Sequence, residues 1–284
     1  MSVNLSIITI NLNNVTGLKK TIESVVNQTY SSFEFIVIDG GSSDGSVQLL
    51  EQYAEHIHHP ISESDNGIYH AMNKGIQLAT GSYCLFLNSG DWLADANVVE
   101  SVFSENPQAD IVSGDIYFYD NQLGQVKWLV PSPHYVTART FFSGMLPHQA
   151  TFIKRSLFNS LGLYNEQLKI ASDWLFFLEA LLVKHHTYQH YKGVVAYFNM
   201  DGISCSPETN SLPRREQRSI LQQKYPLFLA DYEYFDTLEK QSNQWLASRE
   251  YRVYNFLERT GVIQFGVFCR RVKRSVQRNV LRLF

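Results

Sequence analysis

Three aspartates lie where a predicted strand ends or a predicted helix begins, and each suits a particular chemistry. Asp39 ends an apolar run and precedes a Gly-Ser turn, where a carboxylate can accept hydrogen bonds from a base or ribose. Asp91 closely follows another apolar run and offers the oxygen ligand that Mg²⁺ and Mn²⁺ prefer. Asp173 opens an amphipathic helix, whose dipole favours the charged form that a general base needs. Each aspartate, taken alone, is also consistent with a helix cap.

Apolar strands alternate with helix patterns over the first hundred residues. Val3 to Ile10, Phe33 to Asp39 and Tyr83 to Leu87 are strongly apolar runs, and each precedes a predicted helix. Such strands indicate a parallel α/β sheet with helices on both faces. Ligands bind these sheets at the carboxyl ends of the strands, which is where Asp39 and Asp91 lie.

The pattern changes after residue 110. Asp110 to Asp120 and Gln125 to Val130 flank a short turn, which predicts a β-hairpin. A helix is predicted over 173–183, and the chain from Gln217 onward is helical and polar. The sequence therefore indicates an α/β protein with a helical C-terminal extension.

The composition argues against several classes of protein. The 284 residues carry 24 Lys and Arg against 27 Asp and Glu, a net charge of −3, so we expect no nucleic-acid binding through a global basic field. Three distant cysteines indicate neither a disulfide framework nor a cysteine-rich zinc site, and favour a reducing compartment. The N-terminus lacks the pattern of a signal peptide, and no apolar run is long enough to cross a membrane. We expect a cytoplasmic enzyme.

The C-terminal segment differs from the rest in charge. Arg249 to Phe284 holds nine Lys and Arg against two Asp and Glu, which leaves residues 1–248 at −10. From Gly261 onward apolar residues recur every three or four positions between the basic ones. This pattern favours a helix on an anionic membrane surface, and the alternative is a solvated helix packed on the domain.

Four ordered segments resemble a known family: SIITINLNN, TIESVVNQTYSSFEFIVIDGGSSDGS, SESDNGIYHAMNKGIQLATGSYCLFLNSGD and IASDW. They resemble family 2 of the inverting nucleotide-sugar glycosyltransferases. The resemblance is closest to bacterial members that build exopolysaccharide, capsule or O-antigen, such as the colanic acid enzymes. It covers residues 3–205 and is strongest over 3–95.

The resemblance implies a GT-A fold, with a Rossmann-like, mostly parallel central sheet and helices on both faces. A glycosyltransferase domain would span residues 1–205, with a nucleotide-binding half over 1–110 and an acceptor-binding half over 111–205. Residues 206–284 would form the helical extension with its basic amphipathic tail.

The resemblance also implies roles for individual positions. Ser172-Asp173 matches the family's Glu-Asp pair, so Asp173 is the expected catalytic base. The motif from Asn88 to Asp91 takes the place of the family's metal-binding Asp-x-Asp, so Asp91 is the expected ligand of Mg²⁺ or Mn²⁺. The expected nucleotide- and donor-binding positions are Thr9, Asn11, Asp39, Asp65, Asn66, Asn73, Lys74, Asn88 and Ser89.

Two departures from the family pattern concern the metal and the diphosphate. Only the last carboxylate of the usual Asp-x-Asp-Asp remains, at Asp91, so we expect weak metal binding that depends on the nucleotide. The late histidine that many members carry is replaced in the stretch Tyr197 to Gly202, where Asp201 is a candidate substitute. His148 is the better candidate for a donor-binding role, and its alternative is a structural histidine.

The sequence thus predicts an inverting hexosyl- or N-acetylhexosaminyltransferase of cell-surface polysaccharide biosynthesis. It would move a sugar from a nucleoside-diphosphate sugar to a saccharide acceptor, carried by a polyprenyl diphosphate at the inner face of the membrane. A sugar-nucleotide pyrophosphorylase is disfavoured, because Asn11 to Asn14 is not the Gly-rich loop such enzymes need. The alternative is a non-catalytic relative that binds a nucleotide or saccharide with a degenerate metal site, for which Asp173 would be dispensable.

Overall fold

The computed structural model describes residues 3–202 and 211–260 of the chain. The chain divides into two compact units, Met1–Ala230 and Asp231–Phe284. The first unit contains the sheet and every candidate site residue. Helix α8 (Leu212–Lys224) also belongs to this unit, although it follows residue 205. The domain boundary expected there remains a prediction.

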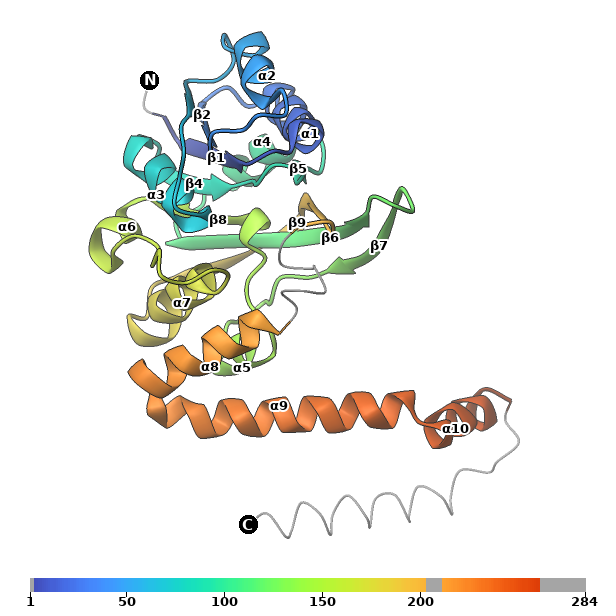
Figure 1. Ribbon diagram of the computed structural model, residues 1–284. Coiled ribbons are helices and arrows are strands. Elements are labelled where there is room, and N and C mark those ends of the chain that lie inside the picture. The colour runs from blue at the N-terminus through green and yellow to red at the C-terminus, as the bar shows by residue number, and fades with distance from the viewer. Residues whose placement is uncertain (1–2, 203–210, 261–284) are drawn as a thin grey trace. The chain divides into compact units, whose positions relative to one another are not determined.

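One sheet of nine strands organises the described part of the first unit (Figure 1). Its order is β3-β2-β1-β4-β8-β6-β9-β5, with β7 paired to β6. The pairs among β1 to β4 are parallel, as is β6 with β9, whereas β5, β7 and β8 pair antiparallel. The strands are β1 (Leu5–Asn11), β2 (Phe33–Asp39), β3 (His59–Ser62), β4 (Tyr83–Phe86), β5 (Trp92–Leu93), β6 (Ile111–Asp120), β7 (Gln125–Val130), β8 (Thr151–Lys154) and β9 (Tyr188–Asn199).

Helices cover both faces of the sheet, which confirms the predicted α/β fold class. Helix α7 continues as a π-helical turn over Glu179–Val183. The helices of the first unit, besides α8, are α1 (Val15–Val26), α2 (Ser46–Gln52), α3 (Ile68–Leu78), α4 (Val98–Ser104), α5 (Ala138–Ser143), α6 (Ser156–Leu161) and α7 (Ser172–Leu178).

The first face of the sheet packs against α1, α2 and α4. The alternation of a strand places every second residue on one face, so Leu5 and Ile7 of β1 join Phe35 of β2 in this core. Helix α1 presents Leu18 and Ile22 to them, both fully buried. Polar residues lie near both ends of these strands: Ser6 donates to Glu34 over 2.6 Å near the starts of β1 and β2, and Asn11 and Asp39 lie at their carboxyl ends.

The second face packs against α3, α6 and α7 through an aromatic core. Phe86 of β4 meets Phe158 of α6 edge to face at 6.1 Å, and Phe158 stacks on Phe176 of α7 at 4.7 Å. Helix α3 approaches β1 closely at Gly75, where a Cβ would lie 2.4 Å from Cγ2 of Ile8. This packing fixes the positions of α3 and α7, which carry the polar groups of the site.

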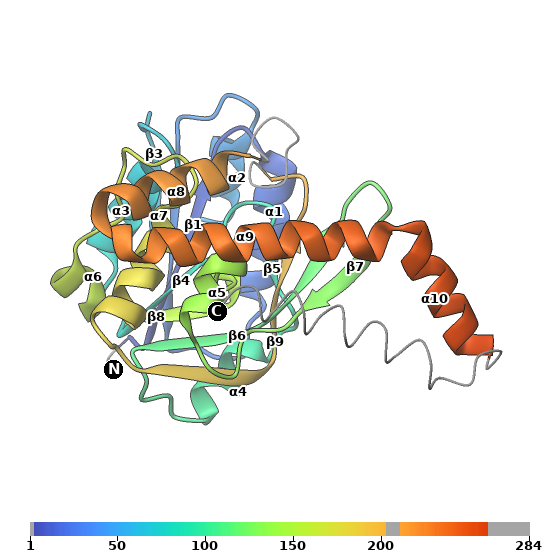
Figure 2. The same cartoon turned by 90° about the horizontal axis from the view of Figure 1, so that it is seen from below.

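The predicted hairpin is confirmed as β6 and β7, and it extends beyond the rest of the sheet (Figures 1 and 2).

The second unit includes α10 (Arg249–Thr260) and most of α9 (Pro226–Ala247). In α9, Lys240 pairs with Asp236 one turn away at 2.7 Å. No helix in the described part of the chain is long and apolar enough to span a membrane. The basic amphipathic tail, residues 261–284, lies outside the described residues.

Candidate functional site

The carboxyl ends of β1 and β2 meet through a buried hydrogen bond. Parallel pairing puts Asn11 opposite Asp39, and Nδ2 of Asn11 donates to Oδ1 of Asp39 over 2.7 Å. On the other side of β1, Thr9 donates to the Leu87 carbonyl over 2.7 Å. The amide oxygen of Asn11 is buried without a protein partner among the described residues. The structure thus brings these three predicted donor-binding residues to one edge of the sheet.

Asp39 organises the Gly-Ser turn that follows it. Its Oδ2 accepts hydrogen bonds from the backbone N–H of Gly41 and Ser42 and from the Ser62 hydroxyl, at 3.2, 2.9 and 2.6 Å. Burial raises the pKa of Asp39, but the hydrogen bonds from Ser42, Ser62 and Asn11 outweigh burial and lower it. Because Asp39 is fully buried and both oxygens accept bonds within the protein, it holds the shape of the turn.

The predicted donor-binding loop before α3 lies beside this turn. A Cβ at Gly40 would lie 2.6 Å from Oδ2 of Asp65, which shows how closely the two segments approach. Oδ1 of Asp65 accepts from the Gly67 N–H over 2.8 Å, and Asn66 is exposed. Lys74 forms an ion pair with Glu63 over 2.6 Å. Asp65, Asn66 and Lys74 therefore border the edge where Asn11 and Asp39 meet.

Asn73 points the other way, toward the loop that precedes α7. Its Nδ2 donates to the Tyr164 carbonyl and to Oε1 of Glu166, at 2.9 and 2.8 Å, and its Oδ1 accepts from the Tyr164 N–H. Only 3% of its surface is exposed. The structure therefore uses Asn73 to attach α3 to the 164–166 loop, and its expected donor-binding role stays a prediction.

The turn from Asn88 to Asp91 closes the end of β4. Gly90 has φ +104°, a conformation that favours glycine. Asn14 donates to the carbonyl and hydroxyl of Ser89, at 3.0 and 3.3 Å. Asp91 is 4% exposed and its Oδ1 accepts from the Asn199 N–H over 2.8 Å, which attaches the turn to the end of β9.

Asp91 and Asn88 carry buried oxygen atoms that could bind a metal ion, and one of these oxygens lacks a hydrogen-bond partner among the described residues. Burial raises the pKa of Asp91 to about 7, although hydrogen bonds from Asn199 and Gln149 lower it. Oδ1 of Asn88 is buried without a protein partner in the described part of the chain. Those described residues hold no cluster of three His, Cys, Asp or Glu side chains that could bind a metal alone. The side-chain oxygens of Asp91 and Asn88 fit an octahedral divalent ion that takes most of its ligands from phosphate and water.

Asp173 lies in the first turn of α7 and is half-buried. Its Oδ1 accepts from the Tyr69 hydroxyl and from the Trp174 N–H, both at 2.9 Å, and Tyr69 accepts in turn from the Ser172 N–H over 3.1 Å. Burial and then the Asp173 charge raise the pKa of Tyr69 well above its usual range, so its hydroxyl stays a donor. No donor from the described residues reaches Oδ2, which leaves that oxygen able to accept a proton.

Glu216 holds the segment in front of Asp173, and nothing in the spacing of the sequence indicates this role. It extends from α8, and its carboxylate accepts from three successive backbone N–H groups, those of Lys169, Ile170 and Ala171, at 2.8, 3.0 and 3.0 Å. Glu216 thereby attaches a helix beyond residue 205 to the start of α7. Only the folded chain brings these two segments, 45 to 47 residues apart, together.

His148 lies in the aromatic core of the second face, as its structural alternative predicts. It is 5% exposed, stacks on Phe86 at 4.9 Å, and its Nε2 lies 2.9 Å from the Tyr164 hydroxyl. Burial lowers the pKa of His148, although the Asp173 charge opposes this shift. Its expected donor-binding role stays a prediction. Asp201, the other candidate for the missing histidine, is exposed next to the end of β9.

We predict that Glu216→Ala loosens the segment before Asp173. Removal of the carboxylate leaves three backbone N–H groups without their acceptor, which should cost about 1–3 kcal/mol of unfolding free energy. Urea unfolding would measure the loss, and hydrogen exchange at Lys169 to Ala171 would show faster exchange there. Glu51→Ala, at an exposed position of α2, is the matched control and should change neither. Unchanged exchange at these three amides in Glu216→Ala would contradict the role.

The raised pKa of Asp91 predicts that the stability of the protein depends on pH. The folded protein holds this carboxyl at a pKa of about 7, whereas an unfolded chain ionises it near pH 4. Ionisation therefore favours the unfolded state as the pH rises from about 4 to about 7, so the free energy of unfolding should fall over that window and then level off. In Asp91→Asn this contribution should vanish. Urea unfolding of both proteins at pH 5 and pH 8 would measure it, and equal pH dependence in the two would refute it.

The family model Glycosyl transferase family 2 matches residues 6–162. A glycosyltransferase of Mycobacterium tuberculosis is 31% identical over 258 residues, which cover 88% of this chain and 92% of the relative. A PGL/p-HBAD biosynthesis glycosyltransferase of the same species is 30% identical over 203 residues, which cover 69% and 77%.

Two solved structures show the same fold. TarS of S. aureus in complex with UDP-GlcNAc has a TM-score of 0.63 at 18% identity, and the match covers 88% of this chain and 77% of that one. The mannosyltransferase PcManGT of Pyrobaculum calidifontis, in complex with GDP-Man and Mn²⁺, has a TM-score of 0.55 at 14% identity, covering 89% and 83%. The fold supports GT-A architecture, and the extent of the family match shows that the chain belongs to glycosyl transferase family 2.

Proposed function

We propose that this glycosyltransferase transfers a sugar, with inversion, from a nucleoside-diphosphate sugar to a hydroxyl of a saccharide acceptor. The observation that carries the proposal is Asp173. One of its oxygens is oriented by Tyr69, and the other has no donor in the described part of the chain. A carboxylate with one oxygen fixed and one available is arranged as a general base.

The nucleotide of the donor would bind where β1, β2 and β4 end. The buried amide oxygens of Asn11 and Asn88 lack protein partners among the described residues, and a bound group that donates hydrogen bonds or carries positive charge would satisfy them. Lys74, at the border of this edge, offers a cation to a phosphate. The two solved relatives were determined with UDP-GlcNAc and with GDP-Man, which supports this class of donor without choosing the base or the sugar.

We propose Asp91 and Asn88 as the protein ligands of Mg²⁺ or Mn²⁺. The ion, when bound, would supply Lewis-acid stabilisation of the charge on the departing diphosphate. An ion near Asp91 would also favour the charged carboxylate that burial disfavours, which links metal binding to the state of this residue. Mn²⁺ is present in the PcManGT complex, which supports a divalent cofactor here.

Asp173 would act on the acceptor. Its unpartnered oxygen takes the proton from the acceptor hydroxyl as the hydroxyl oxygen bonds to the anomeric carbon. The bond from that carbon to the diphosphate breaks on the opposite side, so a single displacement inverts the configuration. Tyr69 prevents the carboxylate from rotating during the transfer, because it donates to Oδ1 while Ser172 donates to Tyr69. The proton ends on Asp173 and then passes to solvent.

We propose that the acceptor is linked to a polyprenyl diphosphate and belongs to cell-surface polysaccharide biosynthesis. The support comes from the sequence, since the basic tail over 261–284 would bring the enzyme to an anionic inner membrane surface.

A specific observation favours a second function: only one carboxylate is found in the described Asn88 to Asp91 turn. The rival is a relative that binds a nucleotide or saccharide without turnover.

Asp173→Asn should abolish transfer and preserve donor binding. The amide keeps the size of the side chain but cannot accept the proton, so release of nucleoside diphosphate from the donor should fall about 10²-fold or more. Calorimetric titration with the same nucleotide should give an unchanged dissociation constant. The matched control is Asp231→Asn, an exposed position in the second unit. Full activity of Asp173→Asn would refute the proposed base, whereas nucleotide binding without any transfer by the wild-type protein would favour the non-catalytic relative.

Nucleotide binding should depend on the metal and on Asp91. Calorimetric titration with UDP, GDP, dTDP and CMP, each with and without Mn²⁺, should show one nucleotide that binds more tightly with the ion. Asp91→Asn should lose this dependence, whereas Asn88→Asp should strengthen it by adding a second carboxylate. Tight binding that ignores Mn²⁺ in all three proteins would overturn the metal assignment, and no binding of any nucleotide would overturn the donor class.

A further inference from the structure

Four aromatic side chains gather on one face of the sheet where β5, β9 and β6 lie side by side. Strand pairing sets Tyr197 opposite both Trp92 and Tyr117, and Tyr119 follows two residues along β6. Trp92 stacks on Tyr197 with ring centroids 4.8 Å apart, and Tyr119 meets Trp92 edge to face at 4.9 Å. The ring of Tyr117 lies 5.2 Å from that of Tyr197. These four residues form the aromatic face.

The aromatic face is partly open to solvent. Each of its four rings is half-buried. Strand β7 of the hairpin widens the apolar surface, because Leu129 lies opposite Tyr117 and is 45% exposed. In the same way Val126 lies opposite Tyr119 and is 40% exposed. A contiguous apolar surface that stays exposed indicates a site of interaction.

The aromatic face also offers polar groups. The hydroxyls of its three tyrosines have no hydrogen-bond partner among the residues that the structure describes. Lys20 of α1 adds an ammonium, which lies 3.1 Å from the ring centroid of Trp92 and 4.6 Å from that of Tyr119. Within the described residues Lys20 forms no ion pair, and burial lowers its pKa. A ligand on this face could therefore gain hydrogen bonds as well as ring contacts.

The aromatic face adjoins the proposed metal site. Trp92 directly follows Asp91 in the chain. The backbone N–H that donates to Asp91 belongs to Asn199, and Asn199 is the residue of β9 opposite Tyr119. A group held on this face would therefore lie close to the diphosphate of the donor, on the side of the acceptor-binding half of the chain.

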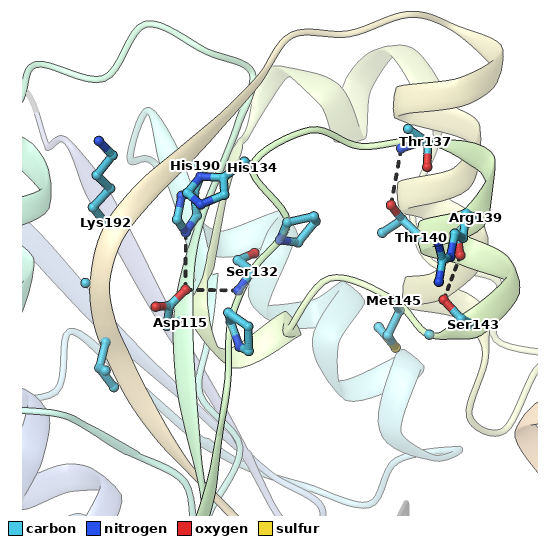
Figure 3. A pocket seen from close by; sticks show the side chains of 15 residues that line it. Asp115, Ser132, His134, Thr137, Arg139, Thr140, Ser143, Met145, His190 and Lys192 are labelled. Carbon is cyan, nitrogen blue, oxygen red and sulfur yellow. Dashed lines mark hydrogen bonds and ion pairs between the residues drawn. The ribbon is translucent and has the colours of Figure 1, made fainter. Parts of the chain in front are cut away.

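A groove of about 820 Å³ continues the surface along β6 toward α5 (Figure 3). Asp115 lines the groove two residues before Tyr117, so both side chains leave the strand on one side. The carboxylate of Asp115 contacts the His190 ring over 3.2 Å. Hydroxyl side chains of α5 and its N-cap line the other wall: Thr137, Thr140 and Ser143. The groove gives a ligand on the aromatic face room to extend.

We infer that the aromatic face binds a sugar ring of the acceptor, with Tyr117 and Tyr119 as the rings that meet it. This inference rests on the proposed transferase function and locates the acceptor of that reaction. Trp92 already packs against Tyr197 and Lys20, whereas Tyr117 and Tyr119 border the exposed residues of β7. Trp92 and Tyr197 would hold these two rings in place.

The mixture of groups on the aromatic face suits a saccharide better than a lipid. A pyranose has a face of C–H bonds and a rim of hydroxyls, so it can lie against aromatic rings while its rim bonds to tyrosine hydroxyls and an ammonium. Hydrocarbon would leave the three hydroxyls and the Lys20 ammonium without partners, which is costly. The face therefore matches the acceptor more closely than it matches a membrane.

The test is saturation-transfer NMR on the full chain, with cellotetraose and N-acetylchitotetraose as neutral probes. The double variant Tyr117→Leu/Tyr119→Leu keeps apolar side chains but removes the rings, so binding of the probe should weaken about tenfold or more. Tyr117→Phe/Tyr119→Phe keeps the rings and should bind more tightly than the leucine variant. Tyr135→Leu, at an 85% exposed position outside the face, is the matched control and should bind as the wild type does. Thermal unfolding would verify that each variant is folded.

Two results would overturn the inference: neither oligosaccharide binds to the wild type, or the wild type and the leucine variant bind equally. Sedimentation with phosphatidylcholine vesicles covers the lipid alternative. Vesicle binding that the leucine variant loses, without oligosaccharide binding, would overturn the inference in favour of a membrane contact. Nucleotide titration separates the two claims. Nucleotide binding without oligosaccharide binding refutes only the role of the aromatic face, and oligosaccharide binding without nucleotide binding refutes the transferase.

Discussion

The buried hydrogen bond from Asn11 to Asp39, 2.7 Å long, joins the ends of the first two parallel strands. Parallel strands end at one edge of a sheet, where their last polar groups leave the ladder and need new partners. Asp39 meets this need by holding its own turn in shape, and Asp91 meets it through the backbone of Asn199. The amide oxygens of Asn11 and Asn88 remain unsatisfied by the described protein, at the edge where a nucleotide would bind.

The other half of the candidate site depends on contacts between helices. Tyr69 of α3 orients Asp173 of α7, and Glu216 of α8 holds the segment that precedes Asp173. Asn73 adds a further attachment from α3 to the loop before α7. The position of the Asp173 carboxylate is therefore set by several helices, which is how a half-buried carboxylate can be kept in a fixed orientation.

Part of the site could be predicted from the sequence because strand ends and helix starts are local features. Asp39, Asp91 and Asp173 can be identified in this way, and the structure places Asp39 at the end of β2, Asp91 in the turn after β4 and Asp173 in the first turn of α7. The direction of a side chain is not local. Asn73 and His148 lie in segments that match the family, yet both are buried against Tyr164, because packing of the second face decides which way they point.

Local sequence patterns are enough to predict the alternation of strands and helices, the hairpin, and the carboxylates near the ends of these elements. Periodicity and turn residues act over a few positions, so they can be recognised without knowledge of the fold. The folded chain is needed to show that Glu216 reaches the start of α7 and that Asp115 contacts the His190 ring. These contacts join segments tens of residues apart, and no local pattern records them.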